Sequence, residues 1–228
     1  MSVIANQPTL KSTFQNSNRL SRAAMKRFFP LAGAVLALTL VTSGVWALEA
    51  PIDVVRNTTS DVVTRVKNEK DALRADPGKM YSLVSEMIFP HFDFQIMSQF
   101  VLGEQWKVAD EVKRKAFVEQ FRKLLVRTYA AALLEYSDQE INYPEPGPQP
   151  ENTRTATVKQ DITNPSSGLL PVVYRLHNKT GEWLVFDVSV DGVSLVKTYR
   201  SSFTSILREG GLDKLIESLA VKNQEIGQ

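Results

Sequence analysis

Residues 169–190, "LLPVVYRLHNKTGEWLVFDVSV", contain two runs rich in branched and aromatic residues, separated by a short polar turn. Runs of this kind, "LLPVVYRLHN" and "EWLVFDVSV" around "NKTG", predict a β-hairpin. The preceding segments "QEINYP" and "RTATVKQDIT" also read as strands, because their apolar residues alternate with polar ones. We therefore predict an antiparallel meander of about four strands between residues 139 and 190.

Helical periodicity occurs on both sides of this meander. Before it, residues 51–76, 79–89 and 110–136 repeat apolar residues at helical spacing, and Asp110 is placed to cap the longest of these helices. After it, residues 193–211 and 212–224 form two further helical segments, separated by Gly210 and Gly211. Segregated helices and strands predict an α+β fold, in which helices cover one face of the sheet.

Residues 1–47 differ from the rest of the chain. All five of their charges are basic, the first acidic residue is Glu49, and the apolar run "FFPLAGAVLALTLVTSGVWA" ends in small residues. This order predicts a secretory signal that is cleaved after about Ala47, with Met25 as a plausible true start. The alternative is a retained membrane anchor, since the run is almost long enough to span a bilayer. The expected product is a single domain, 48–228.

The charge and the cysteine count narrow the function. The chain has 27 basic and 25 acidic residues, and the predicted signal, residues 1–47 (the leader), holds five of the basic residues and none of the acidic ones. The domain that remains after cleavage therefore has an expected formal charge of −3. A slightly acidic domain is a poor candidate for nucleic-acid binding. The chain has no cysteine, hence no disulfide, thiolate nucleophile or N-terminal lipid-modified cysteine. Export without such an anchor predicts a soluble periplasmic protein.

The sequence gives little sign of catalysis. It has no G-x-S-x-G, P-loop or G-x-G-x-x-G motif. The pair His91 and Asp93 resembles two metal ligands without a third, so a polar pair at a helix start is the better interpretation. His177 lies beside the hairpin turn, where we expect solvent. Asp187 and Asp191 would need a cleft to act as an acid–base pair. We expect no enzyme, cofactor or metal site.

Residues 91–106, "HFDFQIMSQFVLGEQW", carry more bulky apolar surface than one short helix needs. This segment predicts either ordinary core or the wall of an apolar ligand site, since periodicity does not separate the two.

A basic cluster on the long helix also has two interpretations. It is either the solvated face of an amphipathic helix or a patch for anionic lipid or an acidic partner. Its members are Lys113, Arg114, Lys115, Arg122, Lys123 and Arg127.

Two long segments resemble the MlaC, or toluene-tolerance, family. They are "VLGEQWKVADEVKRKAFVEQFRKLLVRTYAAAL" and "VVYRLHNKTGEWLVFDVSVDGVSLVKTYRSSF". The order of motifs is kept: L-G-x-x-W, F-x-x-x-F-x-x-L-L, the Y-R-L hairpin, a W-x-V-x-D-V-like strand and G-V-S-L. The strand departs slightly, with "WLVFDV" where W-K-V-x-D-V is usual.

The resemblance implies a periplasmic phospholipid carrier with an NTF2-like, MlaC-type fold and a hydrophobic cavity between sheet and helices. Phospholipid would be cargo, and the partners would be an inner-membrane ABC transporter complex and an outer-membrane lipoprotein–porin complex. Such a monomeric carrier helps maintain lipid asymmetry of the outer membrane. The alternatives are an enzyme of a cone-shaped α+β fold acting on a small apolar substrate through Asp187 or His91, and an adaptor that binds a partner helix.

On this basis we predict fourteen lipid-contacting residues and expect about half of them to be ordinary core. They are Phe92, Phe94, Phe100, Val101, Phe117, Phe121, Leu125, Tyr129, Val172, Tyr174, Phe186, Val188, Tyr199 and Phe203. Trp106 and Trp183 are expected to pack or to lie at the rim of the cavity. Gly103 and Gly192 are expected in tight turns.

Overall fold

A computed structural model describes residues 49–145, 153–164, 168–179 and 181–225. The predicted leader lies outside these ranges, as do most of the proline-rich loop after Tyr143 and of the turn after Asn164. In the described ranges, no helix combines the length and apolarity needed to cross a bilayer.

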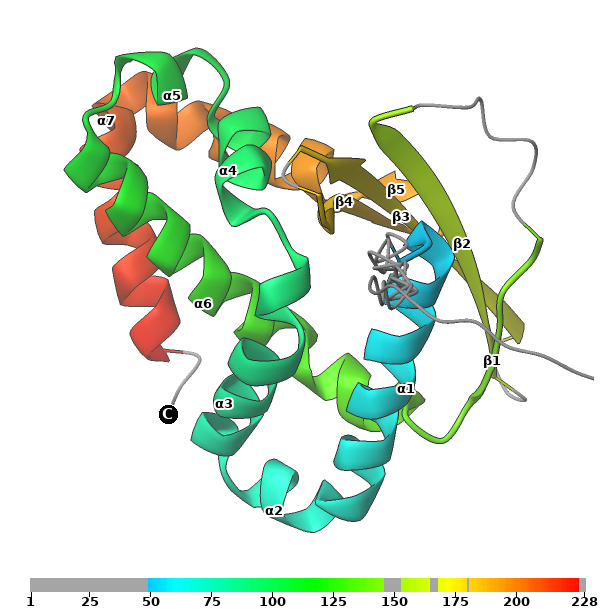
Figure 1. The fold of residues 1–228 in the computed structure, drawn as a ribbon. Helices are drawn as coiled ribbons and strands as arrows, with labels where there is room; N and C mark the ends of the chain where they lie inside the picture. Colours follow the sequence, from blue (N-terminus) through cyan, green and yellow to red (C-terminus); the bar gives the residue numbers. More distant parts are fainter. Residues whose placement is uncertain (1–48, 146–152, 165–167, 180, 226–228) are drawn as a thin grey trace, which may run out of the picture. The chain divides into compact units, whose positions relative to one another are not determined.

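Within the described ranges, seven helices and a short 3-10 turn form the helical part (Figure 1). The segments before the sheet are α1 (Pro51–Asn68), α2 (Lys70–Ala75), α3 (Pro77–Met87), η1 (Phe89–His91), α4 (Phe94–Leu102), α5 (Glu104–Val108) and α6 (Glu111–Tyr136). After the sheet comes α7 (Leu195–Glu225). The predicted helix over 51–76 is therefore two helices, interrupted at Glu69.

The helix boundaries follow from local chemistry. Asp76, Asp93 and Asp110 cap α3, α4 and α6, because each carboxylate accepts a hydrogen bond from a backbone N–H in the first turn. The predicted cap at Asp110 is thus confirmed. α4 ends at Gly103, whose φ of 58° is unfavourable for residues with a Cβ. α7 breaks at Gly211, with φ 69°, as the paired glycines predict.

The sheet is fully antiparallel, and its strand order follows the sequence: β1-β2-β3-β4-β5. The strands are β1 (Glu140–Asn142), β2 (Thr155–Asn164), β3 (Gly168–Asn178), β4 (Trp183–Val190) and β5 (Val193–Ser194). The α+β class and the meander are confirmed, and the additional strand is the two-residue β5. Gly192, with φ 76°, lies in the tight turn between β4 and β5, as predicted.

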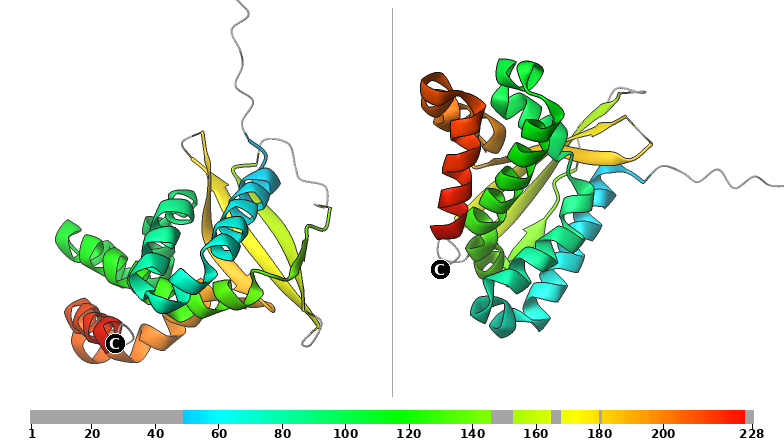
Figure 2. Two further views of the ribbon diagram at one scale, coloured as in Figure 1. Left: turned by 90° about the horizontal axis from the view of Figure 1, so that it is seen from below. Right: turned by 90° about the vertical axis from the view of Figure 1, so that its left-hand side faces the viewer.

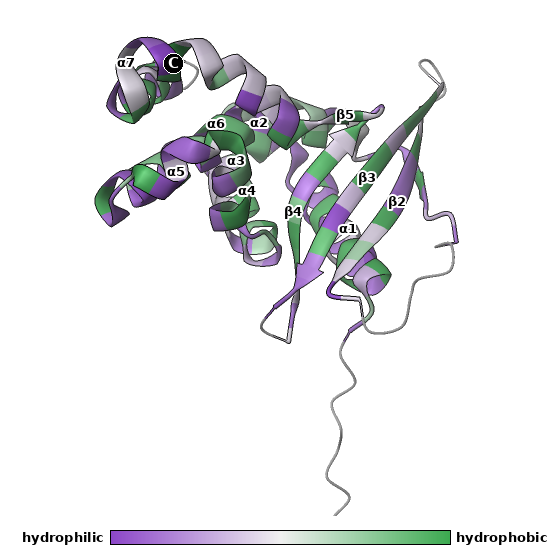
Figure 3. Ribbon diagram, turned by 90° about the horizontal axis from the view of Figure 1, so that it is seen from above, coloured by the Kyte–Doolittle hydropathy of each residue, from purple (hydrophilic) through white to green (hydrophobic). Residues whose placement is uncertain are grey.

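The helices lie on one side of the sheet, with α1 against β2, α7 against β4, and α6 beside α7 (Figures 1 and 2). Apolar and polar residues are interspersed along β3 and β4 (Figure 3), and four consecutive residues of β4, 185–188, are buried. One aromatic-rich core joins α4, α6 and α7 and includes Phe117, Phe121 and Phe203. A second core joins α1–α3 to α6, and a third joins α1 to the sheet.

Candidate functional site

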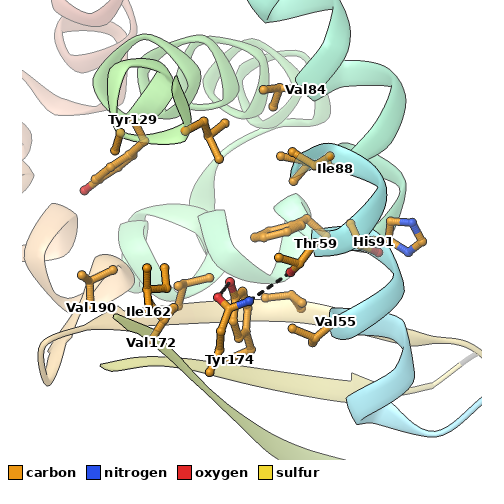
Figure 4. Close-up of a pocket in the computed structure, with 18 of the residues that line it drawn as sticks. Val55, Thr59, Val84, Ile88, His91, Tyr129, Ile162, Val172, Tyr174 and Val190 are labelled. Atoms are coloured by element: carbon orange, nitrogen blue, oxygen red, sulfur yellow. Dashed lines mark hydrogen bonds between the residues drawn. The ribbon is translucent and has the colours of Figure 1, made fainter. Parts of the chain in front are cut away.

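A cavity of about 630 Å³ lies between the sheet and the helices α1, α3 and α6 (Figure 4). This volume falls within the range of about 300–1,000 Å³ that is typical of small-molecule sites. The cavity lies between the second and third cores, where the helices and the sheet do not close completely on one another.

The helical wall consists mainly of small side chains. α1 contributes residues along one face, and α6 contributes residues at helical spacing from Val126 to Leu133, with Val84 of α3 and Ile88 after it. The residues from α1 are Val54, Val55, Thr58, Thr59, Val62, Val63 and Val66. Valine, threonine and alanine at these positions leave a space that larger side chains would fill, because protein interiors otherwise pack to high density.

All five strands of the sheet contribute to the opposite wall. Their lining residues are Ile141, Gln160, Ile162, Leu170, Val172, Tyr174, Val185, Val188, Val190 and Val193. A β-bulge changes the register here, since Arg175 pairs with Asp187 and Leu176 with Val185. Because two residues of β4 oppose one residue of β3, Val185 and Val188 both face the cavity although they are three residues apart.

A small polar group interrupts this apolar wall. The buried Gln160 donates hydrogen bonds to Thr59 Oγ1 (3.1 Å) and the Tyr143 hydroxyl (2.9 Å), and its Oε1 accepts one from the Tyr174 hydroxyl (2.8 Å). These bonds tie α1 to the sheet and satisfy the side-chain amide. Burial raises the pKa of Tyr174, which keeps this tyrosine neutral.

The cavity offers little to a charged ligand. Among the residues that the structure describes, no lysine, arginine, aspartate or glutamate lines the cavity. The pKa of Tyr129 is raised by burial and by the neighbouring Tyr199, so Tyr129 is also neutral. Across the described residues, no three His, Asp or Glu side chains gather closely enough to hold a metal ion. The arrangement suits an extended apolar group and provides few polar contacts to select it.

Five of the fourteen predicted residues line the cavity: Phe92, Tyr129, Val172, Tyr174 and Val188. Phe92 reaches it through a bridge to Val185 of β4. These five come from four separate parts of the chain, and the fold brings them together around one space. Their contact with a lipid stays a prediction.

The structure places the other nine predicted residues outside the cavity lining. Eight belong to the aromatic-rich core or pack against it: Phe94, Val101, Phe117, Phe121, Leu125, Phe186, Tyr199 and Phe203. The ninth, Phe100, is 45% exposed, and its ring centroid lies 5.8 Å from that of Phe186. Helical spacing places the α6 and α7 residues on apolar faces, but these faces pack against each other, and the bulge directs Phe186 into the same core.

His177 is buried, contrary to our prediction of a solvated histidine. Its Nε2 lies 2.9 Å from Asp93 Oδ2. Asp93 also caps α4 through its other oxygen and donates its backbone N–H to the Val185 carbonyl (2.8 Å). This single aspartate therefore connects α4 to two strands, which explains why the chain buries a histidine beside it.

Asp187 has a local structural partner for each carboxylate oxygen. Oδ2 accepts a hydrogen bond from Ser194 Oγ (2.8 Å), and Oδ1 accepts one from the backbone N–H of Val196 (3.2 Å). The carboxylate thus fixes the start of α7. Of the two residues considered for catalysis, His91 lines the cavity and Asp187 does not, so the two side chains do not share one site.

The predicted basic cluster of α6 is largely engaged within the protein. Lys113, Lys115 and Lys123 form ion pairs with Asp213, Glu111 and Glu119. Arg114 lies over Trp106, and Arg122 lies over Phe89 and Phe94. The exposed lysine pairs fit the predicted solvated face, whereas Arg122 and Arg127 are partly buried, each with a buried guanidinium nitrogen, and so do not fit it. Trp106 is a packing residue, as expected.

Sequence reasoning missed most of the cavity wall, above all the α1 residues. Their periodic valines predicted a helix with an apolar face, without indicating what that face would cover. The useful signal is residue size: the cavity is lined by valine, threonine and alanine, whereas phenylalanine, leucine and methionine dominate the filled core.

Comparison with known proteins independently supports the resemblance to the MlaC family. The family described as "MlaC protein" matches residues 56–221. Toluene tolerance protein ttg2D of Pseudomonas putida is 30% identical over 177 residues, which cover 76% of this chain and 81% of that protein. The intermembrane phospholipid transport system binding protein MlaC of Haemophilus influenzae is 25% identical over 199 residues, covering 86% of this chain and 92% of its own.

A solved structure shares the fold. The phospholipid-binding protein from Ralstonia solanacearum, in complex with a phospholipid, has a TM-score of 0.73 and 25% identity. The match covers 79% of this chain and 100% of that chain. The family match spans α1 to α7 and includes every strand of the sheet, so the resemblance seen in the sequence is confirmed: the chain belongs to the MlaC family.

Proposed function

We propose that this protein is a phospholipid carrier that holds acyl chains in the cavity between α1, α6 and the sheet. The observation that carries the proposal is the uncharged, predominantly apolar lining of that cavity. The relatives named for phospholipid binding and transport support it.

The energetics explain why a carrier is needed. A phospholipid has roughly 30 methylenes, each costing about 0.8 kcal/mol to expose to water, so free transfer would cost on the order of 20 kcal/mol. A cavity that encloses the chains removes most of this cost. The headgroup can stay in water, which is consistent with the few polar groups in the lining.

We further propose a periplasmic location, with a leader cleaved after about Ala47 and a monomeric carrier domain over residues 48–228. Its partners would be an inner-membrane ABC transporter complex and an outer-membrane lipoprotein–porin complex, and its action would maintain outer-membrane lipid asymmetry. The protein would hold phospholipid as cargo without catalysis or cofactor. Release would require a partner that favours an open form of the cavity, because enclosed chains leave slowly by themselves.

Two adjacent alanines of α6 provide a matched test. Ala132 lines the cavity, whereas Ala131 is exposed on the same helix. Ala132→Trp should fill space that the acyl chains need, and Ala131→Trp should add the same side chain in solvent. Each purified variant is extracted with organic solvent, and phospholipid per protein is measured by mass spectrometry, with circular dichroism as the folding check.

We expect near-stoichiometric phospholipid in the unmodified protein and in Ala131→Trp, and a clear loss in Ala132→Trp. A folded Ala132→Trp variant with full phospholipid content would show that the cavity is not the lipid site. Absence of phospholipid from the unmodified protein, isolated without detergent and unable to take it up from vesicles, would contradict the proposed function itself.

A further inference from the structure

A second pocket, of about 270 Å³, lies between the end of α4, α5 and the first half of α7. Figure 1 shows these three helices close together at the upper left. It is lined by Val101, Leu102, Gln105, Arg200, Thr204, Leu207 and Arg208. None of these residues lines the apolar cavity, so this is a separate site with different chemistry. Val101, Leu102 and Leu207 make its lining apolar on one side, and Arg200 and Arg208 make it basic on the other.

The two arginines lie on one face of α7. Arg200, Thr204 and Arg208 are spaced by four residues, which places them one above another on a helix. The guanidinium of Arg200 also lies close to Gly103: a Cβ at that glycine would be 3.2 Å from Nη2 and 3.6 Å from Cζ. The turn after α4 thus lets the guanidinium approach the backbone closely.

Neither guanidinium is neutralised within the described part of the chain, where no ion pair or hydrogen bond involves the side chain of Arg200 or Arg208; Thr204 Oγ1 bonds only the backbone carbonyl of Arg200 (2.8 Å). Two acids that are adjacent in sequence to lining residues, Glu104 before Gln105 and Glu209 after Arg208, are engaged with lysines. Glu104 pairs with Lys107, and Glu209 lies 3.5 Å from Lys214. Two arginine forks at a pocket with an apolar wall are suited to bind an oxyanion, because guanidinium pairs with such groups through two parallel hydrogen bonds.

We propose that this pocket is a docking site for an acidic side chain, aspartate or glutamate, of a protein partner. Its small volume fits one side chain, with the apolar wall of Val101, Leu102 and Leu207 beside the aliphatic part. A flat anionic bilayer fits less well, because only a projecting group can enter a pocket of about 270 Å³. The inference extends the proposed function, because a carrier has to dock, but its test does not require lipid.

The test uses three probes: the peptide acetyl-Leu-Glu-Leu-amide, its glutamine counterpart, and phosphatidylglycerol vesicles. Binding is followed by NMR through the arginine Nε–Hε signals of the purified full chain. We expect the glutamate peptide to shift the Arg200 and Arg208 signals saturably, and the other two probes to leave them unchanged. Arg200→Gln and Arg208→Gln should each weaken binding by about tenfold or more, as for loss of a charge-assisted hydrogen bond.

Lys115→Gln is the matched control, because Lys115 is an exposed base paired with Glu111 away from the pocket lining, and it should leave peptide binding unchanged. Equal shifts with the glutamine peptide, shifts with vesicles alone, or no saturable shift at millimolar glutamate peptide would each overturn the docking site. Phospholipid content of the same variants is measured in parallel. Retained lipid with lost peptide binding supports this inference, whereas an empty protein that still binds the peptide contradicts only the carrier function.

Discussion

Replacing Phe121 with alanine would test whether the aromatic-rich core of α4, α6 and α7 is packed interior and not part of a lipid site. Phe121 is 0% exposed, and its ring centroid lies 5.3 Å from that of Tyr199 and 5.6 Å from that of Phe117. Truncating a buried phenylalanine costs about 3–5 kcal/mol. A protein of this size loses about 2–4 °C per kcal/mol, so the Tm should fall by roughly 6–20 °C.

The assay combines thermal unfolding with the phospholipid-to-protein ratio, measured well below the transition of each variant. Phe121→Ala should lose stability but keep phospholipid. Val188→Ala is the comparison, because Val188 lines the cavity; it should lose only about 1.6 kcal/mol for two methyl groups while holding phospholipid less well. An unchanged Tm in Phe121→Ala would refute the packing argument. An empty Phe121→Ala beside a fully loaded Val188→Ala would move the lipid site to the aromatic-rich core.

Three further perturbations follow from individual contacts. Gly103→Ala should cost about 1–3 kcal/mol in urea unfolding, since its φ of 58° is strained for alanine and the new Cβ would crowd Arg200; equal urea midpoints for the two proteins would contradict this. Asp187→Asn should cost about 1.5–3 kcal/mol, because a charged acceptor for Ser194 Oγ and a backbone N–H is lost; unchanged urea unfolding would show that the cap is dispensable. Burial raises the pKa of Tyr174, so the unfolded chain loses this proton first, and stability should fall above about pH 10 by up to about 1.4 kcal/mol per pH unit; Tyr174→Phe should flatten that decline in urea midpoints, and parallel pH profiles would contradict the assignment.

Periodicity was sufficient to predict most helices and strands, but it missed the interruption at Glu69 and the two-residue β5. The predicted segment 110–136 corresponds to α6, and the hairpin over 169–190 corresponds to β3 and β4. The glycine turns at Gly103 and Gly192 also follow from residue type, because their positive φ angles favour glycine. These features are determined by residues close to one another in the sequence, so they can be predicted from one sequence without knowledge of the tertiary structure.

The cavity wall could not be predicted in the same way, because periodicity shows that a face is buried without showing what covers it. The choice of large aromatic residues led toward the filled core, where rings such as Phe117 and Phe121 stack on one another. The bulge in β4 is equally hidden: alternation placed Phe186 and Val188 on one face, and the extra residue separates them. Whether a buried residue lines the cavity or belongs to the packed core depends on which elements lie opposite it in the fold, and local sequence pattern does not show this.

The simple strand order has a consequence for how the chain acquires its structure. Each strand pairs with its neighbour in sequence, so the sheet can assemble hairpin by hairpin without long loop closure. α1 is different, since Thr59 is separated by 101 residues from its partner Gln160. During synthesis its valine-rich stripe is complete long before β2 exists to shelter it. We therefore expect the stripe to stay exposed on the nascent chain until β2 has been made.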